Sequence, residues 1–353
     1  MKKTASELNG VKEIARRANV SIGTVDRVMH NRKGVSDATR LKIEAIIKEL
    51  NFQPNKMASL LATRKNMNFA VLIPAVSEET DYWSYPLNGI NQAAAETNQF
   101  GVTVKPYFYA LDSKESFNRV AEEMLKDEPH AVLLAPSFVE DSQVLAKRIN
   151  ELGLPLAFIN SDLAGQDNLT YIGPDLYQSG RLAAQLVSFS LKPLDKVLII
   201  NISADLRNDH HLVRKEHGFK KFFEETRSAT HISTLNISET KVCVVEEALT
   251  RTLNADNTIK AIFVTNSRVN IVAEILKKHR RNDLLVGYDF LEKNIDYLKS
   301  GQIKYLICQR PKEQGYLGIM ALYKHLYNVS EVERFVYMPI DIITKENYQF
   351  YNG

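Results

Sequence analysis

The sequence VKEIARRANVSIGTVDRVM, residues 11–29, has the pattern of two short helices joined by a turn. Apolar residues recur at helical spacing on either side of Asn19-Val20, a dipeptide that favours a break. We predict one amphipathic helix over Val11–Ala18 and a second over Ser21–Met29, with Ser21 as the cap of the second. Two short helices in this order predict a helix-turn-helix.

The second helix is expected to bury one set of residues and expose another. Val25 and Val28 can face the first helix, while Ile22 and Arg27 lie elsewhere on the surface. A third helix over residues 36–50 begins at its own serine cap and packs beneath the pair. In a helix-turn-helix the N-terminal residues of the second helix enter the major groove of DNA. This part of the chain is therefore predicted to bind DNA.

Basic residues are concentrated in the same region. Residues 1–65 hold 14 Lys and Arg against 6 Asp and Glu, whereas the rest of the chain holds 31 against 36. The net charge of +3 thus divides into a strongly basic head and an acidic remainder. A solvated basic surface would give the same count. The uneven distribution of charge along the chain also fits a polyanion-binding module joined to a domain with another task.

Length and composition limit the class of protein. At 353 residues the chain is long enough for two or three cores, and 44% hydrophobic with 25% charged residues is typical of a globular protein. The two cysteines, Cys243 and Cys308, have no metal-ligand or disulfide-framework spacing. No apolar run follows the charged start, and none approaches the roughly 18 residues of a membrane span. We therefore expect a cytoplasmic protein.

From Phe69 onward, short apolar runs alternate with amphipathic helical segments. Such runs predict parallel strands covered on both faces, and therefore a doubly wound α/β fold. A break at residues 192–195 divides the runs into two similar halves, with a ligand cleft between the halves at the carboxyl ends of the strands. The predicted strands are residues 69–73, 102–109, 131–134, 156–159, 197–200, 261–264, 284–286 and 305–307.

Two motifs in the head carry a family resemblance. Residues 20–27 match Val-Ser-x-x-Thr-Val-x-Arg, and residues 34–40 match Gly-Val-Ser-x-x-Thr-Arg. With both motifs in register, residues 11–63 resemble the DNA-binding head of the lactose-repressor (LacI/GalR) family of transcription regulators. Asp26 departs from the pattern, because the family usually carries Ser there. Phosphate repels a carboxylate, so Asp26 either turns away from the DNA backbone or accepts from a cytosine amine.

The resemblance implies a set of DNA contacts. Ser21 and Thr24 would bind phosphates. Ile22 and Gly23 would face base edges, and Arg27 would donate to guanine or phosphate. Structural alternatives exist: a plain helix cap for Ser21, a buried filler for Thr24 and solvated surface for Arg27. The complete predicted set is Ser21, Ile22, Gly23, Thr24, Arg27, Asn31, Asn55, Ala58 and Leu61.

Residues 52–64 resemble the hinge helix of the family. Pro54 ends the preceding helix, and the short Ala- and Leu-rich stretch after it is too brief to be stable alone in water. The resemblance implies that two such helices from a dimer pack in the minor groove, where Leu61 wedges between base pairs and kinks the duplex. Ordinary packing of Leu61 in a linker is the alternative.

Residues 69–345 are similar to the sensor domains of the family and to periplasmic sugar-binding proteins of the ribose type. Tyr82 and Trp83 match a loop whose aromatic rings stack on a sugar, with core packing as the alternative for Trp83. Asp175 matches a residue that accepts from sugar hydroxyls, although it is also placed to cap the helix that follows it.

Further ligand contacts are implied on one helix and after three strands. Lys215 occupies the cationic position of an Arg-x-x-Gly-Phe element, with Arg214 just before it, and Lys lacks the planar fork of Arg. Asn266, Asp289 and Gln309 each follow a predicted strand and offer amide or carboxylate groups suited to hydroxyls. Turn formation is the alternative for Asp289.

The sequence predicts neither a catalytic site nor a metal site. His210 and His211 stand beside Asp209, but adjacent histidines point apart, and we interpret them as part of a surface loop. We find no nucleophile elbow, phosphate loop or paired-carboxylate motif. We therefore expect no enzymatic activity and no cofactor.

Together these patterns predict a helix-turn-helix domain over residues 1–53, a hinge helix or linker over 54–66 and a sensing domain of two subdomains over 67–353. The expected function is a DNA-binding transcription regulator whose operator affinity is controlled by a small carbohydrate-like effector in the cleft. The expected partners are operator DNA, that effector and a second copy in a homodimer or tetramer, with no membrane. A transport receptor or a sugar-modifying enzyme would explain the second part but not residues 11–65.

Overall fold

The computed structural model describes residues 10–29, 32–50, 52, 66–77, 81–163, 165–203, 210–226 and 229–351. The chain divides into two units, Met1–Thr63 and Arg64–Gly353. The first is helical, and the second is built from two α/β subdomains. The predicted fold class, a helical head followed by doubly wound sheets, is confirmed. The finer boundaries at residues 53 and 66 stay predictions.

Helices in the described part of the head lie where the sequence predicts them: α1 (Val11–Ala18), α2 (Ile22–Met29) and α3 (Asp37–Glu49). Their core includes Ile14, Val25 and Ile43, none of which has exposed surface. Val28 is also buried, so both valines of α2 face inward as predicted. Burial of these aliphatic side chains supplies the main stabilisation of a domain this small.

Single residues account for the ends of these helices. Asn19 ends α1 in the left-handed conformation with φ of 57°, which Asn tolerates better than most residues. The Oγ of Ser21 accepts from the backbone N–H of Thr24 at 3.2 Å. The Oγ of Ser36 accepts from the backbone N–H of Thr39 at 3.3 Å. Both predicted serine caps are confirmed, and each satisfies a donor that the helix itself leaves open.

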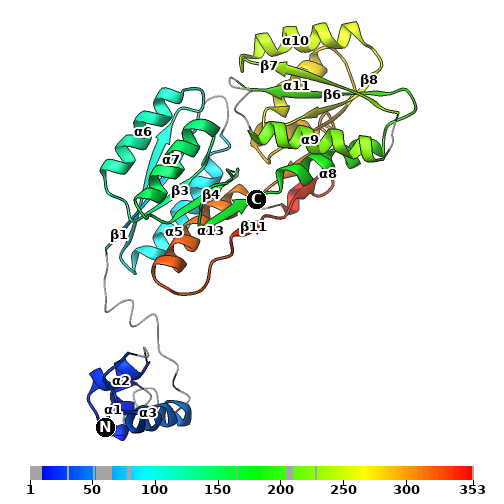
Figure 1. Ribbon diagram of the computed structural model, residues 1–353. Coiled ribbons are helices and arrows are strands. Elements are labelled where there is room, and N and C mark those ends of the chain that lie inside the picture. The colour runs from blue at the N-terminus through cyan, green and yellow to red at the C-terminus, as the bar shows by residue number, and fades with distance from the viewer. Residues whose placement is uncertain are drawn as a thin grey trace. The chain divides into compact units, whose positions relative to one another are not determined.

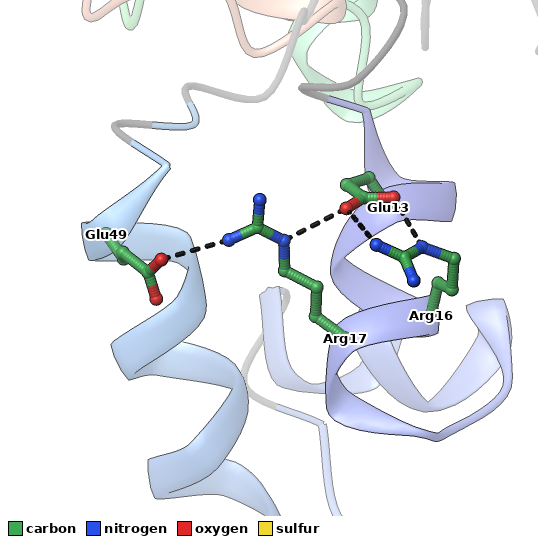
Figure 2. A network of polar contacts seen from close by, with 4 residues as sticks. All are labelled: Glu13, Arg16, Arg17 and Glu49. Atoms are coloured by element: carbon green, nitrogen blue, oxygen red, sulfur yellow. Dashed lines mark hydrogen bonds and ion pairs between the residues drawn. The ribbon is translucent and has the colours of Figure 1, made fainter.

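One acid of α1 joins two arginines, as Figure 2 shows. The Glu13 carboxylate accepts from Arg16 at 2.7 and 2.8 Å and from Arg17 at 2.9 Å. Arg17 also donates to Glu49 at the end of α3, at 2.9 Å. The hydrogen bonds from Arg16 and Arg17 lower the pKa of Glu13 to about 2. This network links α1 to α3 and holds two basic side chains of the head in place.

Two sheets of six strands form the described core of the second unit (Figure 1). The first contains β1 (Met67–Pro74), β2 (Val102–Tyr109), β3 (Ala131–Leu134), β4 (Leu156–Ile159), β5 (Thr170–Gly173) and β11 (Phe335–Tyr337). The second contains β6 (Lys196–Ile202), β7 (His231–Ile237), β8 (Ile259–Val264), β9 (Leu284–Tyr288), β10 (Tyr305–Cys308) and β12 (Asp341–Ile343). The strand orders are β11-β5-β4-β3-β1-β2 and β12-β10-β9-β8-β6-β7. Described neighbours pair in parallel, with β10 and β12 as the antiparallel exception.

Helices cover both faces of each sheet (Figure 1). They are α5 (Ser84–Asn98), α6 (Lys114–Lys126), α7 (Val139–Glu151), α8 (Leu176–Ser188), α9 (His210–Glu225), α10 (Val242–Ala255), α11 (Val269–Lys278), α12 (Glu292–Lys299) and α13 (Pro311–Leu326). Phe69 and Val71 of β1 pack toward α5 and α13, whereas Ala70 and Leu72 pack toward α6 and α7. The second sheet divides likewise between α10, α11 and α12 on one face and α8 and α9 on the other. Among the described residues, no helix has the length and apolar character to span a membrane.

The chain passes between the two sheets at three places. It leaves the first sheet after β5 and enters the second through α8. It returns after β10 through α13, which packs on α5 and on β3, β4 and β5. It crosses again between β11 and β12. Each subdomain is therefore completed by a later part of the chain, and the predicted division into two halves holds with these exchanges added.

The eight strands predicted from apolar runs are present, and the structure adds β5, β7, β11 and β12. Strand β7 lies at a sheet edge, and most of its residues are partly exposed. Strands β11 and β12 are edge strands of three residues each. Edge strands need no continuous apolar run, which explains why the pattern did not reveal them.

Two glycines bring α8 and α9 close together. A Cβ on Gly180 would lie 1.9 Å from the carbonyl oxygen of Lys215, and a Cβ on Gly218 would lie 2.0 Å from that of Tyr177. Any larger residue at either position would force the helix backbones apart. Because Lys215 is on α9, this close approach sets the position of its side chain.

Replacing Glu13 by Gln should loosen the head, because the neutral amide cannot hold two guanidinium groups. The folded-state pKa of Glu13 is lowered, so its stabilisation is present above pH 4.5 and lost as the pH falls toward 2. We expect faster amide hydrogen exchange over residues 11–49 of the full-length variant at pH 7 and unchanged exchange over 67–351. Glu44→Gln, on the exposed face of α3, is the matched control. Equal exchange in the two variants would contradict the role of the network.

Candidate functional site

A cavity of about 260 Å³ lies within the second unit. Its wall is formed by loops that follow strands of both sheets, including Ala75 after β1, Asn160 after β4, Asn266 after β8 and Gln309 after β10. Parallel sheets gather the carboxyl ends of their strands at one edge, where ligands of such folds bind. The cavity is therefore where the sequence predicts a cleft.

Six of the eight predicted ligand residues line this cavity: Tyr82, Trp83, Lys215, Asn266, Asp289 and Gln309. Asp175 and Arg214 are not among its lining residues. The Asp175 carboxylate accepts from the backbone N–H of Gln178 at 3.0 Å and caps α8, as the structural alternative predicts. Arg214 pairs with Asp162 at 2.5 Å, across from α9 to the loop after β4. Ligand contact by Asp175 and Arg214 stays a prediction, and the cavity does not support it because neither residue lines it.

Aromatic rings form part of the cavity wall. The rings of Tyr82 and Trp83 meet edge to face with centroids 5.2 Å apart. The Tyr82 hydroxyl donates to Oδ1 of Asn160 at 2.8 Å, which fixes the ring. Trp83 is 5% exposed but lines the cavity together with Phe138. Core packing and a stacking surface are thus compatible for Trp83, since one ring can contact the core and a ligand.

Lys215 is a buried cation of the cavity. Its Nζ donates to the carbonyl oxygen of Thr265 at 3.1 Å and lies 3.7 Å from the centroid of the Tyr288 ring. The Tyr288 hydroxyl shares a hydrogen bond of 3.0 Å with Ser179 of α8, so the ring is held in position. A desolvated ammonium over an aromatic face gains cation–π stabilisation. The residue can donate to a ligand while it stays anchored in the wall.

Asp289 carries a buried carboxylate that accepts no hydrogen bond from the described residues. Its backbone is left-handed, with φ of 74°, a strained conformation that clusters at functional sites. The amide of Asn294 donates to the backbone carbonyls of Tyr288 and Asp289 at 3.1 and 3.0 Å and holds this turn. Burial raises the pKa of Asp289 to about 6, and the charge of Lys215 limits the rise. Asp289 therefore forms the turn and also presents a carboxylate that can accept a hydrogen bond from a ligand.

The two predicted amide residues of the cavity differ in their hydrogen bonding. Nε2 of Gln309 is buried and has no hydrogen-bond partner in the described part of the chain. Asn266 is already engaged, because its Nδ2 donates to Ile202 O at 2.7 Å and its Oδ1 accepts from the Arg268 N–H at 3.2 Å. Buried polar groups are nearly always paired, so an open donor in a cavity wall points to a ligand acceptor.

His211 and Arg268 are cavity residues that the sequence analysis missed. The surface-loop interpretation of His210 and His211 is wrong, because both lie in the first turn of α9 and His211 lines the cavity. Burial, followed by the charges of Lys215 and Arg268, lowers the pKa of His211 to about 3, so its ring is neutral. Asp209 lies outside the described residues. Helical spacing of four from His211 to Lys215 is the signal that could have found it.

Helix α2 and its cap present the predicted DNA-contact residues of this segment on the surface. Ser21, Gly23 and Arg27 are exposed, and Ile22 is 51% exposed. Thr24 is partly exposed and its hydroxyl lies 2.9 Å from the Ser21 Oγ, so it is not a buried filler. The described side chains leave this face open to a partner.

Asp26 has its own partner in the head. Nη1 of Arg32 lies 3.2 Å from Oδ2 of Asp26, which offsets the negative charge beside the exposed face of α2. This pairing fits the alternative in which Asp26 turns away from the DNA backbone. The remaining predicted contacts, Asn31, Asn55, Ala58 and Leu61, lie outside the described residues, as does the predicted hinge segment over residues 53–65.

No group of three or more His, Cys, Asp or Glu suited to a metal ion occurs among the described residues. The second unit holds a polar cavity at the strand ends of two doubly wound sheets. The first is a helix-turn-helix. This combination defines a class of protein in which a ligand-binding domain is joined to a DNA-binding head.

Comparison with known proteins agrees with this class. Residues 10–55 match the family described as bacterial regulatory proteins, lacI family, and residues 69–328 match the periplasmic binding protein domain. The chain is 25% identical to catabolite control protein A of Staphylococcus epidermidis, over 67% of this chain and 73% of that protein. The chain belongs to the lacI family of bacterial regulatory proteins and is a DNA-binding transcription regulator with a periplasmic binding protein domain.

Two solved structures share the fold. A chain described as a LacI transcriptional regulator from Bacteroides fragilis is 29% identical, with a TM-score of 0.75 over 82% of this chain and 100% of that one. GanP, a glucose-galactose binding protein from Geobacillus stearothermophilus, is 18% identical, with a TM-score of 0.71 over 80% of this chain and 99% of that one. The second likeness is of fold alone.

Proposed function

We propose that this regulator binds operator DNA as a homodimer and that a small carbohydrate-like effector in the cavity controls its operator affinity. One observation carries the effector class. The cavity wall offers a buried carboxylate at Asp289 and a buried amide donor at Gln309, and neither has a partner in the described chain. A hydroxyl can donate to the first and accept from the second.

The size and lining of the cavity agree with this assignment. A volume of about 260 Å³ lies just below the roughly 300–1,000 Å³ of typical ligand pockets and therefore fits a small ligand. The rings of Tyr82 and Trp83 would cover an apolar C–H face of the sugar. Lys215 would supply a further donor. GanP, which shares this fold, is a glucose-galactose binding protein, and this supports a sugar as the effector.

The head would read the operator with the residues at the start of α2. Ser21 and Thr24 would contact phosphates, Ile22 and Gly23 base edges, and Arg27 a guanine or phosphate. Asn31, Asn55, Ala58 and Leu61 complete the proposed set, with Leu61 as the wedge of the hinge segment. Binding to chromosomal DNA would place the protein in the cytoplasm. Effector and operator would influence each other by the same factor, since coupling between binding sites is reciprocal.

Operator binding should weaken steeply with salt, because the basic head would displace counterions from several phosphates. A dimer that contacts six or more phosphates should lose roughly 10³-fold or more in affinity between about 50 and 200 mM salt. Fluorescence anisotropy with duplexes from the upstream region of the gene measures this slope. Arg27→Ala should lower the slope if Arg27 contacts phosphate, whereas the control Glu44→Gln should not. A flat slope for the unaltered protein would contradict the assignment of the head.

Sugar affinity should depend on pH through Asp289. Because the pKa of this carboxyl is raised to about 6, it is ionised above that pH and protonated below it. A hydroxyl donates to the ionised form, so affinity should fall by about tenfold per pH unit below pH 6. Isothermal titration at pH 5, 6, 7 and 8 measures it, with the tightest binder among D-glucose, D-galactose, D-arabinose and D-ribose. The titratable groups that interact electrostatically with Asp289 are Tyr82, Tyr85, Lys215, Tyr288, Cys308 and Tyr351, and His211 and Arg268 line the same cavity.

Asp289→Asn is the control for this dependence. The amide keeps the shape of the side chain but does not titrate, so its weaker binding should be constant from pH 5 to 8. A wild-type affinity that does not change over this range would remove Asp289 from the proposed site.

A further inference from the structure

The C-terminal segment, residues 344–351, follows β12 and contains the short 3-10 helix Tyr348–Phe350. The next residue, Tyr351, packs edge to face on Phe290, with ring centroids 4.9 Å apart. Phe290 directly follows Asp289, and its carbonyl oxygen accepts from the Tyr85 hydroxyl at 3.2 Å. The end of the chain thus contacts the loop that carries the buried carboxylate of the cavity.

Two hollow regions meet at Tyr351. On its outer side is an open groove of about 650 Å³ that runs along α13 and β12 and is lined by Arg310, Asp341 and Phe350 among others. On its inner side is a void of about 10 Å³ that Tyr351 also lines. This void shares Tyr82, Asp289 and Gln309 with the effector cavity. Tyr351 therefore stands between the outer groove and the polar groups of the cavity.

The inner void is too small to carry bulk water between the outer groove and the effector cavity. A volume of about 10 Å³ is at the lower limit for one water molecule, and a water also needs several polar partners. Cys308, which lines the same void, is 1% exposed, and burial raises the pKa of its thiol. Phe290, Leu291 and Pro311 add apolar surface to the lining of this void.

We propose that Tyr351 seals the floor of the effector cavity against water from the outer groove and so positions Asp289 and Gln309 for the effector. The effect of Tyr351 on effector binding rests on the proposed function. The exclusion of water by Tyr351 does not depend on it. Tyr351 is a positioning residue, because it acts through Asp289 and Phe290. Without its ring, water from the outer groove would reach the carboxylate even while the effector fills the cavity, and would compete with the hydroxyl of the ligand.

The seal can be tested without any ligand, by the reactivity of the two cysteines of the full-length chain. Cys243 is exposed and Cys308 is buried behind Tyr351. With the thiol reagent DTNB, the unaltered protein should show one fast thiol per chain and Tyr351→Ala should show two. Tyr351→Phe, which keeps the ring, and Phe350→Ala, which removes the 82% exposed neighbour, should each show one. Equal protection of Cys308 in Tyr351→Ala would overturn the proposal.

Misfolding of the alanine variant would also expose Cys308, so circular dichroism and a melting curve accompany each titration. Tyr351→Leu serves as the milder change, with an intermediate rate expected for Cys308. If both variants keep the fold and protect the thiol as the unaltered protein does, the ring is no seal.

Sugar binding tests the positioning. Tyr351→Ala should bind the tightest of the four sugars named above about tenfold more weakly than the unaltered protein does. Its sugar affinity should also stay constant to a lower pH, because a hydrated Asp289 titrates nearer to its ordinary pKa. Phe350→Ala should match the unaltered protein in both respects. Equal affinity and an equal pH profile in Tyr351→Ala would overturn the positioning role. If the unaltered protein binds none of the four sugars, the proposed effector class fails while the thiol titration still decides the seal.

Discussion

The Asp289 carboxylate is buried at the end of β9, in the same cavity wall as the Lys215 ammonium. A buried charge without hydrogen bonds costs folding free energy, and the charge of Lys215 offsets only part of that cost. The site persists because its surroundings fix it: Asn294 holds the left-handed turn, and the close approach of α8 and α9 places Lys215. A ligand hydroxyl would donate a hydrogen bond to the carboxylate. We propose that this hydrogen bond is a main source of ligand affinity.

Connections between the two sheets explain how such a ligand could act at a distance. Cavity residues come from loops of both subdomains, and the chain crosses between them after β5, after β10 and between β11 and β12. The Arg214–Asp162 ion pair also joins the two subdomains beside the cavity. A ligand held by both walls favours one relative arrangement of the subdomains, which is the differential interaction that any population shift requires. The head responds if operator binding favours one arrangement over another.

Much of the fold and part of the site follow from sequence patterns. The helices of the head and eight strands were predictable because caps and continuous apolar runs are local signals. Edge strands such as β7 and β11, and the return of α13 to the first sheet, depend on tertiary packing that periodicity does not encode. Lys215, Asp289 and Gln309 could be predicted from strand ends and a motif. Arg268 and Tyr351 could not, because their places in the cavity or beneath it depend on segments far apart in the chain. The sequence analysis missed His211, although its helical spacing of four from Lys215 could have revealed it.

The central claim is that occupation of the cavity and binding of DNA are coupled. The most direct measurement is a closed thermodynamic cycle with full-length protein, an operator duplex and the tightest-binding sugar. Operator affinity is measured with and without saturating sugar, and sugar affinity with and without saturating operator. The account predicts that both affinities change by the same factor, of about fivefold or more, and that Asp289→Asn lowers the sugar-dependent change. Sugar binding that leaves operator affinity unchanged would contradict it.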